Sequence, residues 1–429
     1  MESFKVKGNA NLKGNVIISG SKNAAVAVLP AVVLTKETVR LDNIPDITDV
    51  RTMIKILENL GVSIRRRGRN ALDLTPNHLA AIDPSYDLVK KMRASYYFMG
   101  SLLARFGQAR VPIPGGCDLG PRPIDQHLKG FSALGADINI EHGMINLSAK
   151  RLVGTNIYLD VVSIGATINL MLAASSAEGR TVLENVAKEP EIVDLANFLN
   201  AMGAKIRGAG TDVIRIDGVK EYRGVAHTVI PDRIEAGTFM LAAAATGGSV
   251  AVEEIIPKHL EAITAKLREA GAHVVVEPEK INIAAPDPLL PSDLKTFPYP
   301  GFPTDLQPQG MVLLTAAKGL SVITENVFDG RFNQVDELKR MGAKIKVEGR
   351  TALIEGGTRL SGAPVTAHDL RSGAALLIAA LMADGESQIS AIKHIDRGYE
   401  NFEQKLINLG ASIQRVSDDN YEQLSSSLD

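Results

Sequence analysis

The sequence predicts an α/β protein of two similar domains, each built from three copies of one repeated unit. Three observations support this prediction. A helix, a glycine step and an alternating strand recur six times along the chain. An alanine-rich helix followed by a polar turn and a strand recurs out of phase with the first pattern. The length of 429 residues exceeds what one hydrophobic core usually serves, so the chain is expected to divide.

The first pattern is marked by a glycine after each helix, as in "ILENLGVSIRR" and "KLREAGAHVVV". The end of a helix favours glycine because the residue there often takes left-handed backbone angles. Successive glycines are 68 to 74 residues apart, which indicates six repeats of about 70 residues rather than chance recurrence. The six positions are Gly61, Gly135, Gly203, Gly271, Gly342 and Gly410.

The second pattern appears in segments such as "LAAAATGGSVAVEEI" and "LLTAAKGLSVITENV". Helices with small apolar residues on all sides are expected to be buried and closely packed. We place the first domain at residues 21–230, and we assign residues 231–429 to the second. Residues 1–20 alternate like a strand ahead of the first repeat, and we expect them to join the second domain.

Composition excludes several classes of protein. The formal net charge is −2, so no strong positive field favours nucleic acid or an anionic membrane. One cysteine forms neither an internal disulfide nor a cysteine zinc cluster, which suits a reducing compartment. Apolar runs are too short to span a bilayer, and the N-terminus lacks a signal-peptide pattern. We therefore expect a cytoplasmic protein without nucleic-acid binding or membrane insertion.

The only cysteine, Cys117, lies in "VPIPGGCDLGPRP" (residues 111–123) among glycines and prolines, with Arg122 close behind it. A lone cysteine is most often a buried, inert thiol, but a Gly-Gly-Cys loop is a poor core. A redox switch normally needs a second cysteine to resolve it. A catalytic thiol whose acidity is tuned by Arg122 fits the segment best.

Other charged residues stand at helix starts or on loops. "ISGSKNAA" places Lys22 and Asn23 at the start of an alanine-rich helix, which is an anion-binding geometry; an exposed lysine beside an Asn cap explains the segment equally well. "LDVVSIGATINLML" offers backbone N–H groups near Ser163 and Gly165 to a phosphate. Arginine binds two oxygens of a phosphate or carboxylate at once, so several arginines predict an anionic small molecule. Each alone is more often a surface ion pair. They are Arg93, Arg122, Arg331, Arg371 and Arg397.

Asp305 stands in a rigid loop, "YPGFPTDLQPQG". Two roles are open for its carboxylate: a general base, or a cap of the helix that follows. The histidines show no spacing typical of metal ligands. No metal site is therefore expected.

With these residues collected, the chain resembles the UDP-N-acetylglucosamine 1-carboxyvinyltransferase family of enolpyruvyl transferases. The segments that carry the resemblance are, in order, "SGSKNAA", "PGGCDLGPRPID", "PDRIEAGTF", "GFPTDLQ", "DLRSGA" and "HIDRGYE". The resemblance covers all but about the last dozen residues. It implies that each domain is an inside-out α/β barrel of three repeats, with the chain crossing between domains near residues 20 and 230.

The resemblance implies transfer of the enolpyruvyl group of phosphoenolpyruvate to the 3′-hydroxyl of UDP-N-acetylglucosamine, with release of phosphate through a tetrahedral ketal. This is the first committed step of peptidoglycan synthesis, which serves cell shape and division. Cys117 would be the acid at carbon 3 and the target of fosfomycin, and Asp305 would take the hydroxyl proton. Lys22, Arg122 and Arg397 would hold phosphoenolpyruvate. Neither a metal, an organic cofactor nor an oligomer is required.

Further substrate contacts are implied by the same resemblance. They fall on Asn23, Arg93, Pro123, Ile124, Asp125, Gln126, Ser163, Ile164, Gly165, Val327, Arg331, Asp369 and Arg371. The EPSP synthases resemble this fold and share the co-substrate, but their early motif carries a further arginine where this chain reads "SKNAAVAV", and they lack the cysteine loop. A non-catalytic sensor of UDP-sugars is the other alternative, and the intact Cys117 and Asp305 argue against it.

Overall fold

The computed structural model describes residues 2–79, 83–90, 92–113, 124–285 and 288–417. The chain divides into two compact units. What we call the middle unit contains residues 19–113 and 124–231, and the terminal unit contains residues 2–18 and 232–417. The first strands of the chain therefore belong with its C-terminal half, because the chain leaves the terminal unit early and returns to it later.

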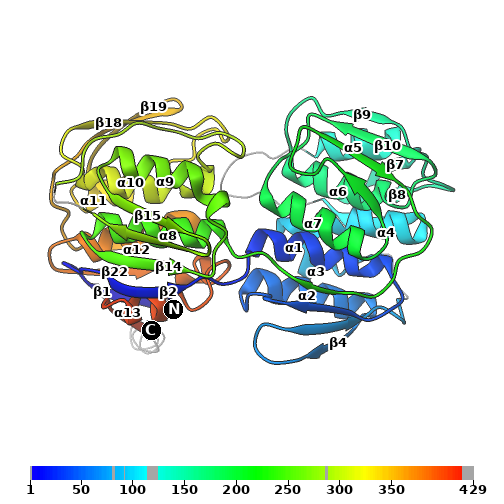
Figure 1. Cartoon of the computed structure of the whole chain (residues 1–429), viewed down its shortest axis with the longest axis horizontal. Helices are drawn as coiled ribbons and strands as arrows, with labels where there is room; N and C mark the ends of the chain where they lie inside the picture. Colours follow the sequence, from blue (N-terminus) through cyan, green and yellow to red (C-terminus); the bar gives the residue numbers. More distant parts are fainter. Residues whose placement is uncertain (1, 80–82, 91, 114–123, 286–287, 418–429) are drawn as a thin grey trace, which may run out of the picture. The chain divides into compact units, whose positions relative to one another are not determined.

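The terminal unit places three long, almost fully buried helices, α8, α10 and α12, inside a layer of sheets (Figure 1). These helices are rich in alanine, leucine and glycine, so neighbouring backbones can approach closely. In chain order the elements are β1 (Glu2–Lys7), β2 (Lys13–Ile17), α8 (Arg233–Ala245), β14 (Ser249–Glu253), η3 (Pro257–Leu260), α9 (Glu261–Glu269), β15 (His273–Glu277), β16 (Lys280–Ala284), β17 (Leu294–Lys295), η4 (Thr304–Leu306), α10 (Gln307–Ala316), β18 (Leu320–Thr324), α11 (Val335–Arg340), β19 (Lys344–Glu348), β20 (Thr351–Glu355), β21 (Pro364–Thr366), α12 (Leu370–Met382), β22 (Glu386–Ser390), η5 (Ile392–His394), α13 (Phe402–Asn408) and β23 (Ser412–Ser417).

The middle unit repeats this arrangement around α1, α4 and α6, which together with neighbouring elements form a separate buried core. Its elements are α1 (Lys22–Ala31), η1 (Val32–Leu34), β3 (Val39–Asp42), α2 (Thr48–Leu60), β4 (Ser63–Arg66), β5 (Leu72–Thr75), α3 (Tyr86–Val89), η2 (Arg93–Tyr97), α4 (Phe98–Phe106), β6 (Gln108–Pro112), α5 (Asp125–Ala133), β7 (Asp137–Glu141), β8 (Met144–Ser148), β9 (Asn156–Tyr158), α6 (Ile164–Ala174), β10 (Arg180–Glu184), α7 (Pro190–Ala201), β11 (Lys205–Arg207), β12 (Val213–Asp217) and β13 (Ala226–Thr228).

The sheets share one topology. Five of the six sheets in the described residues have three antiparallel strands and one parallel edge strand, and the sixth, β6-β8-β7, has the antiparallel strands alone. In the terminal unit, β2 supplies the parallel edge beside β14, and β1 lies between β22 and β23. Helices inside and sheets outside reverse the usual order of an α/β barrel. This confirms the predicted fold class of two inside-out α/β barrels.

The six glycines of the repeat all adopt left-handed backbone angles, with φ between 87° and 112°. At each, the N–H of the following residue donates to a carbonyl five residues earlier, as from Ala343 N to Leu338 O at 3.0 Å. This hydrogen bond closes the last turn of the preceding helix and directs the chain into a strand. The local signal read from the sequence therefore marks the same structural event six times.

Gly342 offers a direct test of this conformational requirement. Its φ is 96°, and an added Cβ would meet no atom closer than 4.0 Å, so only backbone strain opposes a side chain. We expect Gly342→Ala to lower the free energy of unfolding by about 1 kcal/mol. Gly342→Asn should lose less, because asparagine tolerates left-handed angles better. Urea unfolding curves measure both, and an alanine variant as stable as the parent would contradict this account.

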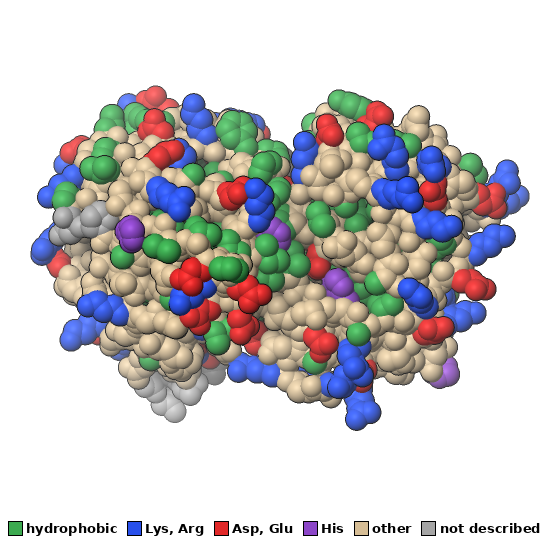
Figure 2. Space-filling model, in the orientation of Figure 1, with side chains coloured by type: hydrophobic (Ala, Val, Ile, Leu, Met, Phe, Trp, Pro, Cys, Tyr) green, Lys and Arg blue, Asp and Glu red, His purple; other side chains and the backbone are tan. Residues whose placement is uncertain are grey.

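None of the helices in the described part of the chain has the length and apolar character needed to cross a bilayer. On the face shown in Figure 2, lysines and arginines are interspersed with aspartates and glutamates. Mixed charge of this kind creates no extended field of one sign on that face.

Candidate active site

The terminal unit holds Asp305 on η4 between two buried arginines. Arg331 Nη1 donates to Asp305 Oδ1 at 3.0 Å, and Arg371 donates to Oδ2 from Nε and Nη2 at 3.2 and 3.1 Å. Both arginine side chains are 4% exposed, whereas that of Asp305 is 29% exposed. The carboxylate is therefore fixed in orientation from within the protein and still reachable from outside.

The alternative that Asp305 caps the following helix is wrong. Helix α10 begins after Leu306 without a side-chain capping hydrogen bond. In the described structure, the Asp305 carboxylate instead accepts hydrogen bonds from the two guanidinium groups. A carboxylate that is not needed for the helix start is available for chemistry.

Asp369 fixes the backbone from which Arg371 projects. It is the N-cap of α12, and its Oδ1 accepts from the N–H groups of Arg371 and Ser372 at 2.8 and 3.0 Å. The Ser372 hydroxyl in turn accepts from the N–H of Asp369 at 3.0 Å, which completes a capping box. The predicted residue Asp369 therefore acts on Arg371 through the backbone.

Arg371 lies with its guanidinium 5.2 Å from the ring centroid of Tyr399. Burial alone lowers the pKa of Arg371, but the neighbouring Tyr399, Asp305 and Asp232 outweigh it, and the net pKa is raised above its ordinary value. The guanidinium is thus a permanent positive charge beside Asp305.

The middle unit places Lys22 at the first residue of α1, which is capped by Ser21 rather than by an asparagine. Lys22 Nζ lies 2.8 Å from Asp49 Oδ2, and the two side chains are 15% and 5% exposed. Asn23 Nδ2 donates to Glu191 Oε1 at 3.5 Å. The alternative of an exposed lysine beside an Asn cap is therefore wrong.

The partners Asp49 and Glu191 are functional candidates that the sequence analysis missed. Each lies in the first turn of its own helix, α2 or α7, and each is nearly fully buried. The sequence signal that could have identified them is an acidic residue on the apolar face of a helix, where an apolar side chain is expected. Only the fold brings these carboxylates to the start of α1.

A second group in this unit surrounds His127. The Arg93 guanidinium lies 5.5 Å from the ring centroid of Tyr96, whose ring packs edge-on against His127 at 4.8 Å. A Cβ at Gly165 would come within 2.3 Å of the Tyr96 hydroxyl and 3.1 Å of the His127 ring, so a side chain here would force its neighbours to shift. The start of α6 is therefore packed closely against η2 and α5.

Burial lowers the pKa of His127 to about 3, and the positive charge of Arg93 adds to the shift. The geometry agrees with a neutral ring. Asn169 Oδ1 accepts from Gly100 N, which orients Asn169 Nδ2 to donate to His127 Nδ1 at 3.0 Å. Protonation of Nδ1 would leave two N–H donors, those of His127 Nδ1 and Asn169 Nδ2, facing each other without an acceptor.

Stability should depend on pH through His127. The unfolded chain binds a proton as pH falls through about 6.5, whereas folded His127 does so only near pH 3. Its contribution is therefore complete above pH 6.5 and falls by about 1.4 kcal/mol per pH unit below it. The stability difference between the parent and His127→Gln should shrink accordingly from pH 7 to pH 5. The exposed His142→Gln is the matched control, and a difference constant with pH would refute the assignment.

Ile124, Asp125 and Gln126 form the start of α5. Gln126 is 5% exposed, and its side chain both accepts from the N–H of Asp160 at 2.9 Å and donates to Asp160 Oδ2 at 3.1 Å. It thereby anchors the loop that leads to Ser163. Ser163 caps α6 by accepting from Ala166 N at 3.2 Å, and Ile164 and Gly165 follow in the first turn.

The remaining predicted residues are placed as follows. Val327 is 36% exposed in the turn after β18, and its N–H donates to Glu325 Oε1 at 2.8 Å. Arg397 is half-buried in the turns that follow η5. Its neighbour Asp396 pairs with Arg415, at 2.8 Å between Oδ1 and Nη2. Cys117, Arg122 and Pro123 lie outside the described residues.

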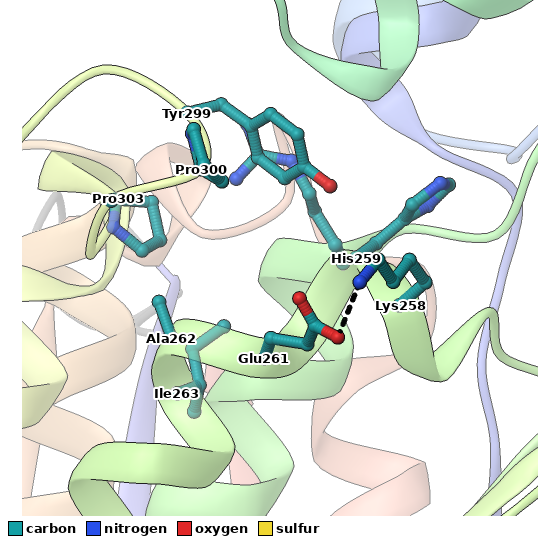
Figure 3. Close-up of a pocket in the computed structure, with 10 residues that line it drawn as sticks. Lys258, His259, Glu261, Ala262, Ile263, Tyr299, Pro300 and Pro303 are labelled. Carbon is teal, nitrogen blue, oxygen red and sulfur yellow. Dashed lines mark hydrogen bonds and ion pairs between the residues drawn. The ribbon is translucent and has the colours of Figure 1, made fainter.

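A small, shallow hollow, partly open to solvent, lies beside the loop that leads to Asp305. Figure 3 shows Lys258, His259 and Glu261 on one side, with the Lys258–Glu261 ion pair at 2.7 Å, and Tyr299 and two prolines on the other. The predicted site residues do not line it. In the described part of the chain, no group of three or more His, Cys, Asp or Glu side chains is arranged to hold a metal ion.

Residues 6–406 match the family model of EPSP synthase (3-phosphoshikimate 1-carboxyvinyltransferase). The chain belongs to this family of enolpyruvyl transferases, and it is a transferase.

Among curated relatives, the chain is 54% identical over 417 residues to the UDP-N-acetylglucosamine 1-carboxyvinyltransferase of Clostridium botulinum, which covers 97% of this chain and 100% of the relative. It is 53% identical over 431 residues to UDP-N-acetylglucosamine 1-carboxyvinyltransferase 2 of Bacillus subtilis, with full coverage of both chains. Among solved structures, the enolpyruvyl transferase NikO of Streptomyces tendae matches with a TM-score of 0.88 and 25% identity, over 97% of this chain and 99% of that one.

Proposed function

We propose that this chain transfers the enolpyruvyl group of phosphoenolpyruvate to the 3′-hydroxyl of UDP-N-acetylglucosamine and releases phosphate, as the first committed step of peptidoglycan synthesis. One observation carries the proposal. Relatives named for this activity match at 52 to 57% identity along nearly the whole chain. The proposal places the reaction in the cytoplasm, with two small-molecule substrates.

The chemistry needs an acid and a base. Protonation of carbon 3 of phosphoenolpyruvate makes carbon 2 electrophilic, and the sugar hydroxyl attacks carbon 2 as it loses its proton. The tetrahedral ketal then loses a proton from carbon 3 and expels phosphate, which leaves the enol ether. We assign Cys117 as the acid and Asp305 as the base.

The geometry of Asp305 supports its assignment. A base must keep its oxygen within hydrogen-bond reach of the hydroxyl, so its orientation must be fixed before the substrate arrives. Arg331 and Arg371 hold both carboxylate oxygens, and part of the carboxylate remains accessible. Because the two arginines are buried, we propose that they act on the reaction through Asp305.

We assign Lys22, Arg122 and Arg397 to the phosphate and carboxylate of phosphoenolpyruvate. Lys22 is the first residue of the capped helix α1, where the helix dipole favours an anion. Until phosphoenolpyruvate binds, Asp49 keeps the ammonium group in place, with Lys22 Nζ 2.8 Å from Asp49 Oδ2.

We assign the remaining predicted residues to the sugar nucleotide, either by contact or by support of its binding surface. The start of α6 offers N–H groups to the diphosphate, and Gln126 supports the loop before it. The full set is Asn23, Arg93, Pro123, Ile124, Asp125, Gln126, Ser163, Ile164, Gly165, Val327, Arg331, Asp369 and Arg371.

Release of phosphate from phosphoenolpyruvate tests the proposal. We expect release only when UDP-N-acetylglucosamine is present, with formation of its 3-enolpyruvyl ether. Shikimate 3-phosphate serves as the competing acceptor, since the family model carries the name of that activity. Release with shikimate 3-phosphate alone would reassign the acceptor, and no release with either would favour a non-catalytic sensor. Fosfomycin should abolish the activity by alkylating Cys117.

A further inference from the structure

Glu325 is a fully buried carboxylate that follows directly after β18. Its Oε1 accepts from the Thr296 hydroxyl at 2.7 Å and from the N–H groups of Val327 and Phe328 at 2.8 and 3.1 Å. Its Oε2 accepts from the Thr304 hydroxyl at 2.9 Å. One side chain thus connects Thr296, which directly follows β17, with the turn after β18 and with the first residue of η4.

Glu325 forms no ion pair with any lysine, arginine or histidine among the residues that the structure describes. Four neutral donors satisfy it instead. A buried charge without a counter-ion is a poor way to stabilise a fold, because its desolvation opposes burial and an apolar side chain would fill the space. Its presence therefore calls for an explanation beyond stability.

The hydrogen bonds continue from Glu325 toward Asp305. A carboxylate only accepts hydrogen bonds, so the single proton of the Thr304 hydroxyl must point at Glu325. The lone pairs of that hydroxyl are then turned toward Arg331, whose Nη1 donates to Thr304 Oγ1 at 2.8 Å. The same Nη1 donates to Asp305 Oδ1 at 3.0 Å. Each group fixes the direction of the next.

We propose that Glu325 is a positioning residue that sets the orientation of the Asp305 carboxylate through Thr304 and Arg331. This inference rests on the proposed role of Asp305 as the base. The same carboxylate holds the N–H of Val327, so it also places the turn that carries this predicted sugar contact. Two parts of the proposed acceptor site are thereby oriented by one buried anion.

Paired threonine variants test the inference. Thr304→Val keeps the side-chain shape but removes the hydroxyl between Glu325 and Arg331. We expect kcat to fall by about tenfold or more, since a small misplacement of a reacting group lowers rates strongly. The dissociation constant of UDP-N-acetylglucosamine, measured by calorimetry, should stay within about twofold. Thr304→Ser, which restores the hydroxyl, should recover kcat to within a few-fold of the parent.

Thr296→Val is the matched control. It also removes one hydroxyl donor to Glu325, from a fully buried residue that does not bond to Arg331 or Asp305. We expect it to lower the melting temperature at least as much as Thr304→Val, while kcat stays within about threefold of the parent. A purely structural role for Glu325 predicts instead that kcat follows the melting temperature in both variants.

Glu325→Gln adds a direct test. Its amide replaces one carboxylate oxygen with an NH2 group, which then faces at least one of the four groups that donate hydrogen bonds to Glu325. We expect a loss of kcat comparable to that of Thr304→Val in protein that is folded by circular dichroism. If the parent transfers enolpyruvate but Thr304→Val retains kcat within threefold, or Thr304→Ser fails to rescue it, the positioning role is overturned while the proposed function stands. A folded parent without transfer activity overturns both.

Discussion

Asp305→Asn is expected to lower kcat by about 10²- to 10⁴-fold and to leave the affinity for UDP-N-acetylglucosamine within a few-fold. The amide keeps the volume and an oxygen for the arginines, but it cannot accept a proton from the sugar hydroxyl. A base acts as the hydroxyl attacks rather than in ground-state binding, so the loss should appear in kcat. Steady-state phosphate release and calorimetric titration with UDP-N-acetylglucosamine measure the two quantities.

The control for Asp305 is Asp384→Asn, which removes a partly exposed carboxylate that pairs with Arg359 at 3.5 Å in the same unit. We expect this variant to keep the parental kcat. Loss of UDP-N-acetylglucosamine binding in Asp305→Asn, with normal kcat at saturation, would show that Asp305 binds the substrate without acting as a base.

Cys117→Ser is expected to lose about 10²- to 10⁴-fold in turnover, whereas Cys117→Asp should remain active. An alkanol is far too weak an acid to protonate carbon 3 near neutral pH, and a carboxylic acid can do so. The aspartate variant should also resist fosfomycin, because it lacks the thiolate that opens the epoxide. Phosphate release with and without fosfomycin measures both effects. A serine variant within a few-fold of the parent would remove Cys117 from the acid role.

The repeat architecture could be predicted from the sequence because its signals are local. A glycine after an apolar helix marks a left-handed turn whatever the rest of the chain does, and all six such glycines adopt it. Alanine-rich helices likewise indicated burial, and α12 buries all but its last residue. What these patterns did not show is that β1 lies between β22 and β23, since strand pairing over such distances is not a local property.

The candidate site was predicted in part. Lys22 and Asp305 stood out because charge interrupts small-residue or proline-rich segments. Arg331 and Arg371 were also candidates, but their pairing with Asp305 was not predicted, and Asp49 was missed. Asp49, Arg331 and Arg371 reach them from helices and turns up to 66 residues away along the chain. Whether Asp305 caps a helix or has a carboxylate available as a general base was likewise undecided until those arginines were located.

Glu325 shows most clearly what the sequence determined and what only the tertiary structure decided. The letters Glu-Asn-Val recur at residues 184–186 and 325–327, and the sequence alone treats the two glutamates alike. The strand β10 includes Glu184 and leaves it exposed, whereas β18 ends one residue earlier, at Thr324, and Glu325 is buried. Successive residues at a strand end point to opposite sides, so one residue of register separates a solvated glutamate from a buried one. The sequence determined the repeats, their turns and the residues able to do chemistry, because these depend on local conformation and residue type. The tertiary structure decided which of those residues meet, because burial and hydrogen bonding depend on register and on strands far apart in the chain.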